Sequence, residues 1–504
     1  MSKFTELLNV LTEKHLLGSS VEVLWWDQET YLPENAFAFR GEQVSLLSKL
    51  KHERFTSKAT GDIINRLYEE LQSKPENFDH EQSVIIRCAH RDYTKLTKLP
   101  ASFIAEQSQA ISKSMSAWLK AREQKDFAIF APHLEKVIEL AIQKSRYIDS
   151  SQHPYDVALD EYEPGFTVNK LDVLFAGIKK ALIPTLPKVL AHQNEQKSVT
   201  LTGCFDVEKQ KQFVNEVLKD LGFDFSSGRM DLSVHPFAIT LGPEDVRVTS
   251  RFNNTGIEGI YSSIHECGHG LYEQGLNKKY PGTGLAEATS IGVHESQSRF
   301  WEVFVGREKP FITRYLPRLQ ELFPHLKHLS EQDFYRAINH VNASPTRIGA
   351  DEISYHLHIT LRYEMERDLF NGDIKVKDVP EVWSGKIRDY LGVEVKDDLQ
   401  GALQDIHWAQ SLLGYFPTYT IGSMYAAQFL TTMYKEISDF DQNITSGNFH
   451  PLYNWLAKNI FSAGRSVNGP ELIENVTGEE VSEKYLLGHL QRKWSDDMEV
   501  SCAG

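Results

Sequence analysis

Cysteine is scarce in this sequence, which has four cysteines among 504 residues and no pair with C-x-x-C spacing. This scarcity excludes a disulfide-stapled fold and a zinc site built from cysteine pairs, because both need several cysteines at short spacing. It also favours a reducing compartment, so we expect a cytoplasmic protein. The four positions are Cys88, Cys204, Cys267 and Cys502.

Long apolar runs and an excess of positive charge are lacking as well. No stretch has the roughly 20 consecutive apolar residues that a membrane-spanning helix needs. The first ten residues include Lys3 and Glu6 and lack the apolar core of a signal peptide. Lysine and arginine number 54 against 69 acidic residues, which gives a net charge of −15. We therefore expect neither a nucleic acid nor a membrane as a partner.

Helical spacing of apolar residues runs through most of the chain, broken at Leu24 to Pro33, and predicts a mostly α protein. Between residues 231 and 252 the period changes to two. Three short β-like runs there predict a small antiparallel sheet, with the last run as an edge strand. Repeats, low-complexity tracts and linkers are missing, so we expect one domain over residues 1–504. The three runs are Leu232 to Val234, Ile239 to Leu241 and Val246 to Thr249.

The sequence His265-Glu266-Cys267-Gly268-His269 is an H-E-x-x-H motif inside a helical pattern. Two histidines four residues apart lie on one helix face, where both imidazoles can bind one Zn²⁺. In such sites the glutamate lies beside the water that the zinc activates. We therefore predict His265 and His269 as metal ligands and Glu266 as the general base.

A catalytic zinc needs a third protein ligand and one open position. A second helical pattern, from about Leu285 to Phe304, carries His294 and Glu295 beside a stripe of small residues that would let another helix approach closely. We predict Glu295 as the third ligand, which confines the zinc site to residues 265–295. His294 is the alternative ligand, since neighbouring helical residues point about 100° apart and both cannot easily bind one ion.

At this point the sequence resembles the carboxypeptidase Taq family of zinc metallocarboxypeptidases. Both histidine motifs look like the metal-binding motifs of that family, and further motifs in the same order extend the resemblance over essentially the whole chain. The matching segments are Trp26 to Thr30, Tyr162 to Gly165, His235 to Phe237, Asp245 to Thr249, His265 to Gly275, His294 to Arg299, Arg347 to Glu352, Gly401 to Trp408 and Gly414 to Tyr419.

The resemblance implies a single helical, saddle-like fold with a deep central groove, found as a homodimer. It implies removal of single residues from the C-termini of peptides, with broad specificity. The implied cofactor is one Zn²⁺ per chain, which Co²⁺ can replace.

The remaining motifs carry predicted substrate contacts. A carboxypeptidase has to bind a free carboxylate, and Arg347 is the predicted group for it, as the resemblance implies; the alternative is a salt bridge to a neighbouring acid such as Asp351. On the predicted edge strand, Asp245, Arg247 and Thr249 would bind an extended substrate through strand addition. The alternative there is a simple pair between Asp245 and Arg247.

The segment after residue 400 holds several hydrogen-bond donors. Related zinc peptidases stabilise the oxyanion with a histidine and a tyrosine, so we predict Tyr415 for this role, with His407 assisting. Tyr419 is predicted to contact substrate or to be a buried aromatic residue. Gln404 and Asp405 are predicted to orient ligands or substrate.

Two other functions stay open on the sequence alone. An oligopeptidase that cuts internal bonds could use the same zinc helix, and it would also cleave peptides with an amidated C-terminus. A non-catalytic peptide-binding protein would have lost one of the four central residues, and the sequence retains all of them, namely His265, Glu266, His269 and Glu295.

Overall fold

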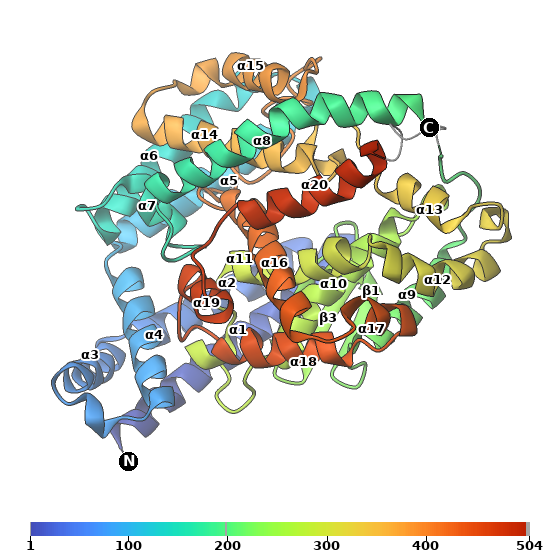
Figure 1. Cartoon of the computed structure of the whole chain (residues 1–504). Coiled ribbons are helices and arrows are strands. Elements are labelled where there is room, and N and C mark those ends of the chain that lie inside the picture. Colours follow the sequence, from blue (N-terminus) through green and yellow to red (C-terminus); the bar gives the residue numbers. More distant parts are fainter. Residues whose placement is uncertain (1, 197–198, 500–504) are drawn as a thin grey trace. The chain divides into compact units, whose positions relative to one another are not determined.

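A computed structural model describes residues 2–196 and 199–499 (Figure 1). The chain forms two compact units, each assembled from three separate segments. Unit 1 consists of Met1–Thr97, Leu201–Tyr335 and Phe429–Gly478, and unit 2 of Lys98–Thr200, Arg336–Gln428 and Glu479–Gly504. Most of the described residues are helical, as the sequence predicts.

Unit 1 holds the sheet and most of the helices. Its elements are α1 (Lys3–Thr30), α2 (Phe37–Thr56), α3 (Lys58–Ser73), α4 (His80–Thr97), α9 (Val207–Leu221), β1 (Gly228–Leu232), β2 (Ala238–Gly242), β3 (Asp245–Ser250), α10 (Glu258–Gly275), α11 (Ile291–Arg299), α12 (Lys309–Leu322), α17 (Phe440–Ser446), α18 (His450–Asn459) and α19 (Gly469–Thr477).

Unit 2 is built from α5 (Ala101–Gln124), α6 (Ala131–Ile148), α7 (Pro154–Leu159), α8 (Val168–Glu195), α14 (Ser354–Asn371), α15 (Val379–Leu391) and α20 (Lys484–Glu499). The boundary between the units falls inside two helices, α13 (Glu331–Ile338) and α16 (Pro417–Glu436).

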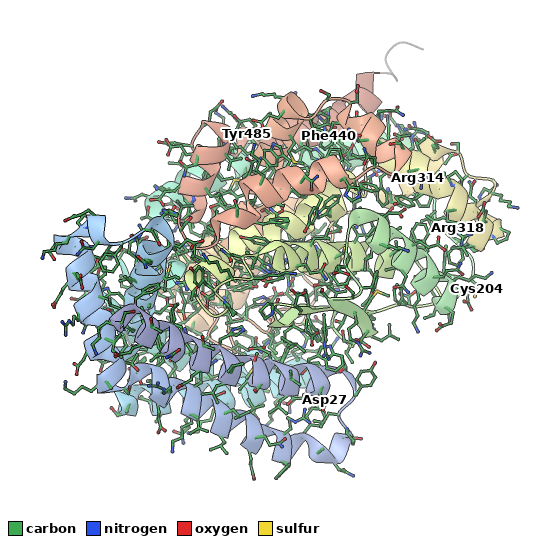
Figure 2. All side chains as sticks on the ribbon, turned by 90° about the horizontal axis from the view of Figure 1, so that it is seen from below. Asp27, Cys204, Arg314, Arg318, Phe440 and Tyr485 are labelled. Carbon is green, nitrogen blue, oxygen red and sulfur yellow. The ribbon has the colours of Figure 1, made fainter. Side chains whose placement is uncertain are left out.

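Helix α1 is longer than its sequence pattern predicts. The side chain of Ser2 caps its N-terminus by accepting from the backbone N–H of Thr5, and the helix then continues through the tryptophans at 25 and 26 to Thr30. It runs beside α2, with Asp27 near its end (Figure 2). Asp27 accepts a 2.7 Å hydrogen bond from Arg40 of α2. The interruption predicted at Leu24 to Pro33 is therefore wrong for residues 24–30, where packing against α2 compensates for a weak local pattern, and is confined to residues 31–33.

The three strands form a mixed sheet in the order β1-β3-β2, so the prediction of a purely antiparallel sheet is wrong. Strand β1 pairs with β3 in parallel, whereas β2 and β3 are antiparallel neighbours. Strand β3 is thus central and not an edge strand. Its buried Val248 lies under α10, where a methyl group on Gly270 would come within 3.1 Å of the valine side chain. The sheet therefore supports α10 from below.

The described cysteines Cys88, Cys204 and Cys267 form no disulfide, and Cys502 lies outside the described residues. Among the helices that the structure describes, none is both long enough and apolar enough to cross a bilayer.

Candidate active site

Helix α10 presents His265 and His269 one turn apart, and α11 brings Glu295 opposite both of them. The Nε2 atoms of the two histidines lie 3.6 and 3.5 Å from Oε2 of Glu295. One ligand atom from each residue lies within 4.8 Å of the others. Two ligand atoms bound at about 2.1 Å to a tetrahedral ion are about 3.4 Å apart. The three side chains therefore fit one small cation such as Zn²⁺.

The two helices approach closely because Gly268 has no side chain. A methyl group added there would lie 2.5 Å from the backbone oxygen of Gln297 and 2.6 Å from Cα of Ser298. The helical pattern predicted from Leu285 is shorter in the structure, since α11 begins at Ile291. The close contact is consequently confined to the turns that carry the candidate ligands.

A carboxylate fixes the imidazole of His265 from behind. Nδ1 of His265 lies 3.0 Å from Oε2 of Glu302, which follows α11 in a π-helical turn, Phe300–Val305. Glu302 also accepts from Arg299 at 3.3 Å and from Arg307 at 3.0 Å. Burial alone would raise the pKa of Glu302, but Arg299 and the other cations hold it well below its ordinary value. An ionised Glu302 keeps the proton of His265 on Nδ1 and leaves Nε2 available to a cation.

His269 is held by a longer chain of polar groups. Its Nδ1 lies 2.6 Å from Nδ1 of His294, whose Nε2 lies 2.9 Å from Glu273. Glu273 in turn accepts a 2.7 Å hydrogen bond from the hydroxyl of Thr240 on β2. His294 therefore contacts the back of His269 and lies outside the group of candidate ligands, which leaves Glu295 as the third member.

The electrostatics of this cluster favour a bound cation. Although burial lowers the pKa of His265, Glu295 and Glu302 raise it to about 9. Burial, together with the other two imidazoles, lowers the pKa of His269 well below its ordinary value and keeps it neutral. Burial and the neighbouring carboxylates raise the pKa of Glu266 to about 7, close to the value that suits a general base at neutral pH.

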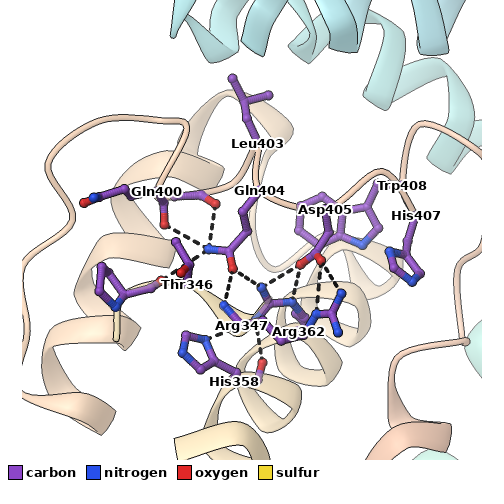
Figure 3. Close-up of polar contacts among 12 residues, drawn as sticks. Thr346, Arg347, His358, Arg362, Gln400, Leu403, Gln404, Asp405, His407 and Trp408 are labelled. Atoms are coloured by element: carbon purple, nitrogen blue, oxygen red, sulfur yellow. Dashed lines mark hydrogen bonds and ion pairs between the residues drawn. The ribbon is translucent and has the colours of Figure 1, made fainter. Parts of the chain in front are cut away.

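In unit 2, Arg347 pairs with Asp405 (Figure 3). Nε and Nη2 of Arg347 donate to Oδ1 of Asp405 at 3.0 and 2.8 Å. The salt bridge of the alternative interpretation is thus present, but its acid is Asp405 and not Asp351, whose carboxylate accepts from the backbone N–H groups of Asn342, Ile353 and Ser354. Gln404 uses its side-chain oxygen to accept from the backbone N–H of Arg347 at 2.8 Å.

The rings of His407, Tyr415 and Tyr419 also lie together in unit 2. Nε2 of His407 is 3.1 Å from the hydroxyl oxygen of Tyr419, and the ring centroids of His407 and Tyr415 are 5.7 Å apart. Both tyrosines are partly exposed, so Tyr419 is not the fully buried aromatic residue of the alternative interpretation. Burial lowers the pKa of His407 to about 4 and leaves its imidazole neutral at pH 7.

The sheet residues are arranged differently from the sequence prediction. Arg247 donates twice to Asp245 at 2.8 Å and lies over the ring of Trp26, 4.2 Å from its centroid. The simple pair left open by the sequence is thus present. Thr249 is fully buried, and its hydroxyl accepts from the backbone N–H of Phe237. Because β3 is central, it has no free edge for strand addition, and that part of the prediction is wrong. Substrate contact by these three residues stays a prediction.

The structure thus gathers the predicted ligands with Glu266 in unit 1, and Arg347, Gln404, Asp405, His407, Tyr415 and Tyr419 in unit 2. Sequence reasoning missed the residues behind them. Glu302 could have been found, because it follows Glu295 by seven residues, about two helical turns. Glu273 could have been found in the same way, because it follows His269 by four residues, one helical turn. Arg362, which contacts Asp405, carries no such local signal.

Comparison with known proteins places these features in context. The family model described as "Carboxypeptidase Taq (M32) metallopeptidase" matches residues 6–494. Carboxypeptidase 1 of Bacillus subtilis (strain 168) is 38% identical over 493 residues, covering 97% of this chain and 98% of its own. Thermostable carboxypeptidase 1 of Thermus thermophilus is 37% identical over 504 residues, covering 98% of both chains. The crystal structure of an M32 carboxypeptidase from Deinococcus radiodurans R1 superimposes with a TM-score of 0.94 at 34% identity, covering 99% of each chain.

Proposed function

The chain belongs to the carboxypeptidase Taq (M32) family of metallopeptidases, and from this membership we propose that it removes single residues from the C-termini of peptides with broad specificity. It is a metallocarboxypeptidase, and the proposal concerns its metal, its residues and its substrates. The observation that supports the proposal most strongly is the group of His265, His269 and Glu295, whose ligand atoms lie within 4.8 Å of one another.

Zinc is the proposed metal, with one ion per chain and cobalt as a substitute, because two imidazoles and one carboxylate suit Zn²⁺. When bound, the ion would lower the pKa of a water molecule and polarise the scissile carbonyl. Glu302 and His294 would keep the two imidazoles oriented with Nε2 toward it.

Glu266 is the proposed general base. Its carboxylate accepts a proton from the attacking water and then gives it to the amine that leaves. A pKa raised to about 7 by burial suits both steps, since the group can bind and release a proton near neutral pH. Tyr415, assisted by His407, is proposed to donate a hydrogen bond to the oxyanion that forms at the scissile carbon.

Arg347 is proposed to bind the terminal carboxylate of the peptide. Its guanidinium is only partly buried, with 15% of the side chain exposed, and Asp405 holds one edge of it. Arg247, Asp245, Thr249 and Tyr419 are proposed as further substrate contacts. Gln404 and Asp405 are proposed to act on substrate through Arg347.

We further propose that residues 1–504 act as one metallocarboxypeptidase domain, because the family model extends through segments of both units. A homodimer in the cytoplasm is proposed from the family resemblance and the scarcity of cysteine. Sedimentation velocity of the zinc-loaded protein tests the dimer: a mass near twice 57.6 kDa supports it, and a mass near 57.6 kDa contradicts it.

The experiment that tests the function is product analysis by mass spectrometry on paired peptides, each supplied as free acid and as C-terminal amide. Stepwise loss of single residues from the free acids alone, stopped by a chelator and restored by zinc, is the expected result. Cleavage of the amides at internal bonds would instead identify an oligopeptidase and remove Arg347 from its proposed role. The Glu266→Gln variant should retain metal and lose turnover by about 10³-fold.

A further inference from the structure

Arg362 on α14 is a fully buried arginine whose guanidinium hydrogen-bonds to three different residues (Figure 3). Nε donates to Oδ2 of Asp405 at 2.7 Å, and Nη2 donates to the side-chain oxygen of Gln404 at 2.6 Å. Nη1 donates to the backbone oxygen of His358 at 2.8 Å, which anchors the group to its own helix. The guanidinium therefore fixes the side chains of two neighbouring residues in the segment before α16.

Both of those side chains in turn hold Arg347. Asp405 accepts from Nε and Nη2 of Arg347 through its other oxygen, Oδ1. Gln404 accepts from the backbone N–H of Arg347 through the same oxygen that contacts Arg362. The backbone and the side chain of Arg347 are thus both fixed by acceptors that Arg362 keeps in place.

A guanidinium offers two edges that can each hold a carboxylate by two hydrogen bonds. Asp405 occupies the edge formed by Nε and Nη2 of Arg347. The remaining edge consists of Nη1 and the second hydrogen of Nη2, and Nη1 has no hydrogen-bond partner within residues 2–196 and 199–499. The orientation that Asp405 imposes therefore decides where this second edge points.

The charges of the cluster do not cancel. Asp405 is one carboxylate between two guanidinium groups, and the arginines hold its pKa well below the ordinary value against burial. Burial lowers the pKa of His358 to about 3 and that of His407 to about 4, so neither adds charge at pH 7. The two guanidinium groups carry two positive charges and Asp405 carries one negative charge. The cluster therefore retains about one positive charge, which can attract an anion.

We propose that Arg362 is a positioning residue for C-terminal carboxylate recognition, which it serves through Asp405 and Gln404 without touching the substrate. The proposal rests on the proposed role of Arg347. Arginine is needed at position 362 because its planar fork reaches two acceptors and a backbone oxygen at once, and a lysine ammonium lacks this fixed geometry. Two variants separate geometry from charge: Arg362→Lys keeps the charge and loses the fork, whereas Arg362→Met loses both.

Binding is measured by calorimetry in a Glu266→Gln background, with zinc-loaded protein that does not turn over. The probe is an N-blocked tripeptide ending in alanine, supplied as free acid and as C-terminal amide. We expect Arg362→Lys to weaken free-acid binding roughly tenfold and Arg362→Met about 100-fold, the scale of a misplaced binding group. Amide binding should stay within about twofold of the parent protein. In the active protein, the KM for free acids should rise while kcat changes little.

The matched control is Glu364→Gln, two residues further along α14. Glu364 is also buried and forms ion pairs with Lys179 and Lys386 of unit 2, but it contacts none of the residues that hold Arg347. The Glu364→Gln variant should lower the melting temperature without changing the ratio of free-acid to amide affinity. Circular dichroism and thermal unfolding of each variant show whether it folds, and Arg362→Lys carries the test if Arg362→Met does not.

The proposal is overturned if free-acid and amide affinities fall together, if neither changes, or if the control shifts their ratio as much as the Arg362 variants do. A different result marks failure of the underlying function. If the parent itself binds free acid and amide equally well, then Arg347 does not recognise a carboxylate.

Discussion

Replacing Gly268 by alanine should damage the candidate metal site without touching a ligand. The added methyl carbon would lie 2.5 Å from the backbone oxygen of Gln297, whereas ordinary contacts begin at 3.4 Å. The backbones of α10 and α11 must therefore separate by about 0.9 Å. Both are regular helices, so the shift moves Glu295 away from His265 and His269 as a body.

The expected losses follow from this displacement. Overpacking of this kind costs about 1–3 kcal/mol of folding free energy. Metal–ligand distances tolerate only about 0.2 Å of deviation, so a shift of about 0.9 Å exceeds the tolerance several times over. We expect zinc affinity to fall at least roughly tenfold, since changes behind a ligand alone cost about 10- to 100-fold.

Zinc affinity is measured by competition with a chromophoric chelator, and stability by thermal unfolding of the metal-free protein. The control is Gly270→Ala on the same helix, where the atoms nearest to a methyl group would be side-chain atoms of Phe223 and Val248, at 2.8 and 3.1 Å. It should lower stability and leave zinc affinity intact. Unchanged zinc affinity in Gly268→Ala, or an equal loss in the control, would refute the reasoning.

Three further variants test separate parts of the structure. Glu302→Gln should lower zinc affinity about 10- to 100-fold by releasing the imidazole of His265, measured by the same competition assay. Burial raises the folded-state pKa of Glu366 to about 7, so its contribution to stability is favourable below the unfolded pKa near 4.5 and is lost as the pH rises to about 7. The unfolding free energy of the wild type relative to Glu366→Gln should therefore fall by about 3 kcal/mol over this range in urea titrations, and no fall would contradict the burial argument. In the wild type the ammonium of Lys493 lies 2.6 Å from the buried carboxylate of Glu352. Lys493→Ala removes this positive charge from beside the buried negative charge, and should destabilise the protein by about 3–5 kcal/mol in the same assay.

The candidate metal site was accessible from sequence because its geometry is local. A spacing of four residues in a helix places His265 above His269 whatever the tertiary structure. The small residues near Glu295 also indicated a close helix contact, although the structure shows that the decisive small residue is Gly268 on the other helix. The position of His294 behind His269, and not among the candidate ligands, could be assigned only from the three-dimensional structure, because its neighbours come from α10 and not from its own helix.

Features that depend on distant segments could not be predicted in this way. The order of the sheet strands follows from pairing between β1 and β3, and alternation within a strand does not show which neighbour it takes. Asp405 was predicted to orient other groups, but its partner Arg347 lies 58 residues away and Arg362 lies 43 residues away. Buried ion pairs of this kind leave no periodic signal in either segment.

The interleaved construction of the two units has a consequence for synthesis on the ribosome. Unit 1 holds the candidate metal ligands but closes only with its last segment, which ends at Gly478. About 180 residues must therefore be made after Glu295 before that unit is complete, which takes roughly 10–40 s at ordinary elongation rates. During this interval the apolar faces of α10 and α11 lack part of their final surroundings. Productive folding of this chain should depend strongly on chaperones that shield nascent surfaces, and a break in the chain at 200/201, 335/336 or 428/429 would divide both units between the two fragments.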